Sequence, residues 1–120
     1  MARYQHLPIF QSTYDLTLEI HKRANNFPRM HRHSIGEKIK NTSIDLLDLI
    51  VTANSAKNKT MYLENAQNIL EKLKIYIRIC FDLKILGQKG FEFLTRKIDE
   101  IGRQLNKWKE WSTSSSLRMQ

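Results

Sequence analysis

Two stretches of heptad spacing, separated by a short segment, occupy residues 62–111. In the first stretch, mostly apolar residues recur at alternating intervals of four and three, namely Tyr62, Ala66, Ile69, Leu73, Tyr76, Cys80 and Leu83. The second stretch has the same spacing at Phe91, Leu94, Ile98, Ile101, Leu105 and Trp108. Because an α-helix has about 3.6 residues per turn, this spacing keeps side chains on one stripe. Residues 87–90 suffice only for an antiparallel reversal, so the sequence predicts a helical hairpin with a continuous apolar seam.

Two more helices are predicted before this hairpin. The first covers about residues 12–25, or begins earlier near Pro8, which is tolerated in a first turn. It ends before Pro28, since a proline disfavours helical geometry in the residue before it. The second covers about residues 34–53 and opens with Ser34 and Glu37, which have the spacing of a capping box. The hairpin helices are expected at about residues 60–86 and 91–111. These elements predict an all-α fold, an antiparallel up-and-down four-helix bundle of residues 1–111, with the serine-rich residues 112–120 as a disordered tail.

The composition indicates a single domain in a reducing compartment. A chain of 120 residues can bury one core without covalent staples. Its only cysteine, Cys80, rules out an intrachain disulfide, and the place of Cys80 on the seam predicts a core residue. No apolar run approaches the ~20 residues of a membrane span, and residues 1–10 lack the apolar stretch of a signal peptide. We therefore expect a cytoplasmic protein that does not contact membranes.

The charge points to a polyanionic partner. The chain has 20 Lys and Arg against 12 Asp and Glu, a net charge of +8, and residues 55–89 contribute +4 of it. Lys74 and Arg78 lie one helical turn apart within this segment and are predicted to contact nucleic-acid phosphates. Arg29 and Arg32, in the connection after the first helix, form a second predicted nucleic-acid or partner contact. Such binding should depend on salt and show little base preference.

Several apolar residues do not fit a single buried stripe. They are Ile44, Leu47 and Val51 in the second helix, and Ile75 and Ile79 in the third. A helix that is apolar on more than one face must bury the second face against something else. These residues are therefore predicted to form the interface of a homo-oligomer.

Nothing in the sequence indicates catalysis. It contains no zinc-protease motif, no di-metal pair, no glycine-rich phosphate loop and no nucleophile elbow, so we predict no enzyme activity, no cofactor and no metal site. The remaining enzyme alternative is a ribonuclease of the HEPN class, in which four to six residues separate an arginine from a histidine. Arg29 and His33 have only three residues between them, which does not fit.

Three segments together resemble a known family of four-helix bundles. The segments are Phe27-Pro28-Arg29, residues 77–83 with the sequence IRICFDL, and residues 98–108 with the sequence IDEIGRQLNKW. Over about residues 5–111 the chain resembles the accessory variability proteins of diversity-generating retroelements. Proteins encoded within ribosomal RNA intervening sequences share the bundle and are the alternative family, with an obscure role. The chain departs from the expected pattern at Asn106 and Lys107, where glycines would be expected before the tryptophan.

The resemblance implies a specific function. Accessory variability proteins form homopentameric barrels with positively charged surfaces, and they bind a reverse transcriptase and its template RNA during error-prone cDNA synthesis. They have no catalytic activity of their own. By this resemblance Lys74 and Arg78 match basic positions of the charged surface, and Arg29 and Arg32 are weaker matches.

Overall fold

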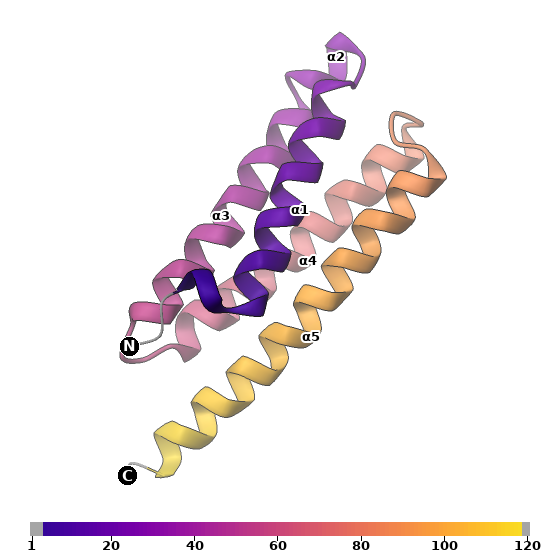
Figure 1. Ribbon diagram of the computed structural model, residues 1–120. Coiled ribbons are helices and arrows are strands. Elements are labelled where there is room, and N and C mark those ends of the chain that lie inside the picture. The colour runs from indigo at the N-terminus through magenta and orange to yellow at the C-terminus, as the bar shows by residue number, and fades with distance from the viewer. Residues whose placement is uncertain (1–3, 119–120) are drawn as a thin grey trace.

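The computed structural model describes the backbone of residues 4–118 and the side chains of residues 4–114. Four long helices dominate it: α1 (Pro8–Asn25), α3 (Ile35–Ser55), α4 (Thr60–Asp82) and α5 (Gln88–Arg118). A short 3-10 helix, η1 (Tyr4–His6), precedes α1, and the single-turn helix α2 (Arg29–Arg32) lies between α1 and α3 (Figure 1). No strand occurs within residues 4–118.

The long helices form one elongated antiparallel bundle. Each packs against two neighbours, so that α1 contacts α3 and α5, and α4 contacts the same two helices from the opposite corner. The bundle measures 53 × 20 × 20 Å. The connection that contains α2 and the turn between α4 and α5 lie at the same end of the bundle (Figure 1). The predicted all-α four-helix bundle is thus confirmed.

Most residues of the predicted seam lie in or against the core, but the buried stripe of α4 is rotated from the predicted heptad line. The buried residues of α4 are Leu63, Ala66, Leu70, Leu73, Ile77 and Cys80. Tyr62, Ile69 and Tyr76 are only partly buried at the edge of this stripe. The predicted seam residue Leu83 is 48% exposed, because α4 ends at Asp82 and the chain turns away there. The buried stripe of α4 departs from a single heptad line because α4 packs against α3 on one side and α5 on the other.

In α5 the predicted seam is mostly correct. Leu94, Ile98, Ile101 and Leu105 are buried, whereas Phe91 and Trp108 are partly buried against the core.

The helix ends differ from the predictions in two places, and α1 takes the earlier of its two predicted starts. Helix α1 begins at Pro8, where the missing N–H of proline costs nothing in a first turn. The Ser34 hydroxyl donates back to the carbonyls of Met30 (3.1 Å) and His31 (3.4 Å), so the predicted capping box does not form after the α2 turn. Helix α5 continues past Trp111 to Arg118, although residues 112–120 were expected as a disordered tail. Ser112 is buried, because it lies on the same helical stripe as Leu105; residues 119–120 of the expected tail lie outside the described residues.

The reversal between α4 and α5 is built by a lysine. Lys84 has φ 63, its N–H donates to the carbonyl of Phe81 (3.0 Å), and the N–H of Ile85 donates to the carbonyl of Cys80 (3.1 Å). These hydrogen bonds are those of a Schellman motif, whose left-handed residue is usually glycine. Gly87 has open space around it, and Gly90 lies inside α5. The predicted antiparallel reversal is therefore present, but Lys84 makes the turn and neither Gly87 nor Gly90 does.

Candidate nucleic-acid interface

The predicted pair on α4 is accessible and lies beside α5. Lys74 Nζ is 3.2 Å from Asp99 Oδ1, and each side chain is 46% exposed. Arg78 Nε is 3.8 Å from Asp82 Oδ2, and the Arg78 side chain is 77% exposed. Exposed ion pairs of this kind contribute at most about 1 kcal/mol, so an incoming phosphate can replace either carboxylate. In the free protein, however, the charge of this pair is balanced by its neighbours.

A groove of about 520 Å³, here called the α4 groove, runs beside this pair between α4 and α5. Its lining residues are Lys74, Ile75, Arg78, Phe81, Asp82, Phe91 and Thr95. The rings of Phe81 and Phe91 stack with their centroids 4.4 Å apart. Cations beside aromatic side chains are the combination that binds single-stranded nucleic acid, with phosphates on the cations and bases against the rings. The groove therefore has suitable chemistry for such a ligand.

The second predicted cluster lies at the end of the bundle. Arg29 is exposed at the start of α2, and Arg32 is partly buried, with its Nε donating to the carbonyl of Phe27 (3.3 Å). The fold places this cluster between α1 and α3, whereas Lys74 and Arg78 lie between α4 and α5. The predicted contacts thus belong to two surfaces, which do not merge into one site.

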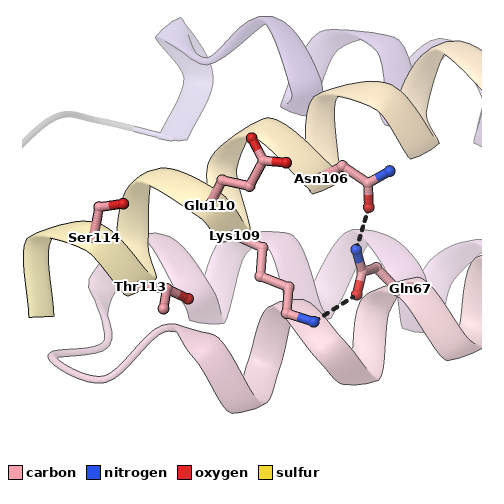
Figure 2. A pocket seen from close by; sticks show the side chains of 6 residues that line it. All are labelled: Gln67, Asn106, Lys109, Glu110, Thr113 and Ser114. Carbon is pink, nitrogen blue, oxygen red and sulfur yellow. Dashed lines mark hydrogen bonds between the residues drawn. The ribbon is translucent and has the colours of Figure 1, made fainter. Parts of the chain in front are cut away.

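A polar groove lies between α4 and the C-terminal part of α5, as Figure 2 shows. It encloses about 390 Å³ and is lined by Gln67, Asn106, Lys109, Glu110, Thr113 and Ser114. Gln67 Nε2 donates to Asn106 Oδ1, and Lys109 Nζ donates to Gln67 Oε1 (3.5 Å) and lies 4.0 Å from Glu64. Gln67, Asn106 and Lys109 bond to one another across the two helices, so these contacts serve helix packing. The expected end of the fourth helix at residue 111 left out Thr113 and Ser114, which line this groove.

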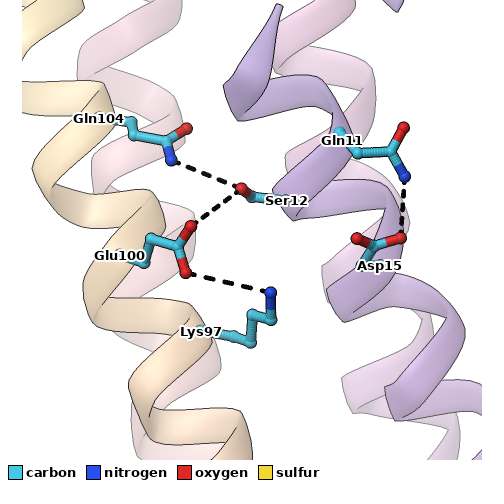
Figure 3. A network of polar contacts seen from close by, with 6 residues as sticks. All are labelled: Gln11, Ser12, Asp15, Lys97, Glu100 and Gln104. Atoms are coloured by element: carbon cyan, nitrogen blue, oxygen red, sulfur yellow. Dashed lines mark hydrogen bonds and ion pairs between the residues drawn. The ribbon is translucent and has the colours of Figure 1, made fainter.

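Part of the segment that carries the family resemblance packs α5 against α1 (Figure 3). The Ser12 hydroxyl donates to Glu100 Oε1 (3.4 Å), and Gln104 Nε2 donates to Ser12 Oγ (3.4 Å). Lys97 Nζ lies 4.0 Å from the other oxygen of Glu100. The Glu100 and Gln104 side chains thus set the register of α1 on α5, which is a structural role.

The residues predicted for an oligomer interface divide between two surfaces. Ile44 is 40% exposed, and Leu47 and Val51 are partly buried. They follow Ser43, whose carbonyl accepts a hydrogen bond from the Thr17 hydroxyl of α1 (3.5 Å). Tyr14 and Leu18 of α1 are 43% and 46% exposed on the outer side of the same contact. We call this surface, formed by Tyr14, Leu18, Ile44, Leu47 and Val51, the α1–α3 face.

The second surface is the outer side of α4. Met61, Ile75, Ile79 and Leu83 are 58%, 57%, 40% and 48% exposed and fall at helical spacing along one line. We call this line the α4 face. Because α1 and α4 occupy opposite corners of the bundle, the two faces cannot act as one patch.

The described residues offer little reactive chemistry. Among residues 4–114, no group of three or more His, Cys, Asp or Glu is arranged to hold a metal ion. Burial raises the pKa of the Cys80 thiol to about 11, so this thiol is protonated at neutral pH and unsuited to act as a nucleophile. No helix in the described part of the chain is long and apolar enough to cross a membrane.

A family model described as bAvd-like matches residues 7–112. This chain belongs to the bAvd-like family. The family takes its name from the Bordetella accessory variability protein of diversity-generating retroelements, so the resemblance inferred from the sequence is confirmed. No match to a curated protein was found.

The bAvd-like match extends over the whole bundle. It begins at Leu7, next to the first residue of α1, and ends at Ser112 within α5. Both apolar faces, the α4 groove and the α2 connection therefore lie inside the region shared with the family. The departure at Asn106 does not disturb this region, since Asn106 bonds to Gln67 of α4.

Proposed function

We propose that this bAvd-like protein is a non-catalytic accessory protein that joins template RNA to the reverse transcriptase of a diversity-generating retroelement during mutagenic cDNA synthesis. The family match over residues 7–112 is the observation that carries this proposal. The net charge of +8 supports the RNA part of it, because a small basic domain attracts polyanions and releases their counterions on binding.

The α4 groove supplies one contact for the RNA in this proposal. Lys74 and Arg78 exchange Asp99 and Asp82 for phosphates, and the stacked phenylalanine rings receive an unpaired base. Arg29 and Arg32 provide a further contact at the end of the bundle. Because phosphates rather than base edges are bound, affinity falls steeply with salt and varies little with sequence.

Assembly into a homopentameric ring completes the proposal. An interface of two-fold symmetry uses one self-complementary patch, whereas a ring joins two different patches head to tail. The presence of two separate apolar faces on this bundle supports the second arrangement, with the α1–α3 face of one copy on the α4 face of the next. In a ring each weak cationic contact is repeated, so binding of one protomer raises the effective concentration of RNA at the others.

The test of this function is capture of the reverse transcriptase encoded by the same retroelement. Tagged protein and enzyme are expressed together, and the enzyme retained after a wash in moderate salt is measured, with an unrelated protein of equal net charge as control. We expect retention by this protein and not by the control. Equal retention by both, or by neither, would contradict the proposed partnership.

A further inference from the structure

One end of the bundle supplies most of the net positive charge. This end, here called the basic end, consists of residues 22–34 and residues 83–90, and its cations are Lys22, Arg23, Arg29, Arg32, Lys84 and Lys89. The two ranges contain six Lys and Arg and no Asp or Glu. The rest of the chain has 14 Lys and Arg against 12 acidic residues, so the basic end supplies +6 of the net +8.

Packing between α1 and α5 joins the two ranges into one surface. The guanidinium of Arg23 in α1 lies 5.9 Å from the ring centroid of Phe93 in α5. It also rests against Gly90, where a Cβ atom would collide with this guanidinium and lie 2.9 Å from Leu86 Cδ1. The connection containing α2 and the α4–α5 turn therefore end at the same level, as Figure 1 shows.

Most cations of the basic end lack an acidic partner. Arg23 pairs with Glu19 (2.9 Å). Within residues 4–114, the other five make no ion pair, and Lys22, Arg29, Lys84 and Lys89 are exposed. This distinguishes them from Lys74 and Arg78, which both contact carboxylates. Cations without internal partners attract phosphates without first losing an intramolecular ion pair.

The backbone of Lys84 is independent evidence for a function at this end. Its φ of 63 lies in the left-handed region, which costs free energy for any residue with a Cβ atom and none for glycine. Strained positions of this kind cluster at functional sites. A lysine here keeps a cation at the tip of the turn at the expense of stability.

We propose that the basic end, rather than the α4 groove, is the principal contact for the phosphate backbone of RNA. This inference rests on the proposed function and assigns its RNA site to Lys22, Arg29, Arg32, Lys84 and Lys89. Met30, 78% exposed among these cations, provides an apolar contact for a sugar or an unpaired base. In a cyclic oligomer equivalent ends lie at one level, so the basic ends form a ring of cations on one rim.

Two triple variants with the same charge loss test the site. The end variant combines Arg29→Gln, Lys84→Gln and Lys89→Gln, and the control combines Lys57→Gln, Arg103→Gln and Lys107→Gln, which lie away from the basic end. The control residues are also exposed and make no ion pair within residues 4–114. Circular dichroism and light scattering first establish that both variants keep the helicity and mass of the parent.

The affinity for a structured RNA is then measured by fluorescence anisotropy over a range of salt concentrations. Loss of three phosphate contacts should weaken binding ~100-fold near physiological salt and reduce the salt slope by about two to three, while the control changes affinity by less than about fivefold. The pair Lys74→Ala with Arg78→Ala should weaken binding less than the end variant does. Equal loss in the end and control variants, or a larger loss in the α4 pair, would overturn the site. If the parent itself fails to bind RNA at low salt, the RNA part of the proposed function fails together with this inference.

Discussion

Lys84 and Cys80 lie four residues apart, and their environments differ in an instructive way. Lys84 is exposed in a left-handed turn, and Cys80 is fully buried at the last turn of α4. The carbonyl of Cys80 accepts the hydrogen bond from Ile85 that closes the turn. The lysine side chain is therefore free to serve a ligand, whereas the cysteine serves the core.

Replacing Lys84 by glycine should separate stability from binding. Lys84→Gly removes the steric cost of a left-handed residue and should raise the free energy of unfolding by about 1 kcal/mol. The same change removes one phosphate contact and should weaken RNA binding about fivefold. Denaturant titration measures the first effect and anisotropy the second, with Gly87→Ala, in open space, as a control that leaves RNA binding unchanged. A destabilised Lys84→Gly variant would contradict the assigned turn geometry.

Burial of Cys80 makes stability depend on alkaline pH. Desolvation raises the pKa of this thiol from its ordinary value of 9.0 to about 11, so the unfolded chain loses the proton first as pH rises. This contribution to the free energy of unfolding is complete below about pH 9 and is lost as pH approaches 11. The loss amounts to about 2 kcal/mol at pH 10.5. Urea unfolding at pH 8 and pH 10.5, compared with Cys80→Ala, isolates this contribution from lysine and tyrosine titration. An identical pH dependence in both proteins would show that the thiol is accessible in the folded state.

At the scale of elements, the heptad spacing predicted the number and order of the long helices but not every detail of their faces. The stripe of α4 is turned because residues such as Leu63 and Ile77 pack between two neighbouring helices, and a single heptad line describes contact with one. The start of α5 at Gln88 follows from the left-handed turn at Lys84. It could not be predicted, because a lysine in the sequence gives no signal for a left-handed conformation. The extension of α5 past residue 111 was missed because serine-rich composition favours disorder, whereas the structure buries Ser112.

The turned stripe of α4 can be checked with one substitution at two positions. Leu73 is fully buried and Leu83 is 48% exposed, although both lie on the heptad line of the sequence. Leu73→Ala should therefore lower the free energy of unfolding by about 2–5 kcal/mol. Leu83→Ala should lower it by less than about 1 kcal/mol. Denaturant midpoints measure both losses. Similar losses would contradict the rotated stripe and show that Leu83 is buried like Leu73.

At the scale of the whole molecule, the charge distribution became visible only when the fold joined distant segments. Counted along the chain, the net positive charge is greatest in residues 55–89, which pointed to Lys74 and Arg78. The bundle instead places residues 22–34 beside residues 83–90, and the basic end belongs to neither segment alone. The α1–α3 face likewise becomes visible only in the fold, because it combines Leu18 of α1 with Ile44 of α3.

The two apolar faces predict the response of the assembly to a buried charge. Ile79→Glu places a carboxylate in the α4 face, where desolvation without a partner is costly, and should dissociate the oligomer into 14.2 kDa monomers of unchanged helicity. Met30→Glu, outside both faces, should leave the oligomer intact. Light scattering at micromolar concentration measures both masses. A monomeric parent protein would contradict the ring, as would an Ile79→Glu variant with the mass of the parent.

The most direct test of the account is reconstituted cDNA synthesis. Purified reverse transcriptase of the same retroelement is incubated with its template RNA, with and without this protein, and the cDNA is quantified. We expect cDNA to accumulate when the parent protein is added, and not to accumulate with Ile79→Glu or with the triple variant of the basic end. Equal cDNA synthesis in the absence of the protein would contradict its role as an accessory factor, and cleavage of the RNA by the protein alone would contradict a non-catalytic one.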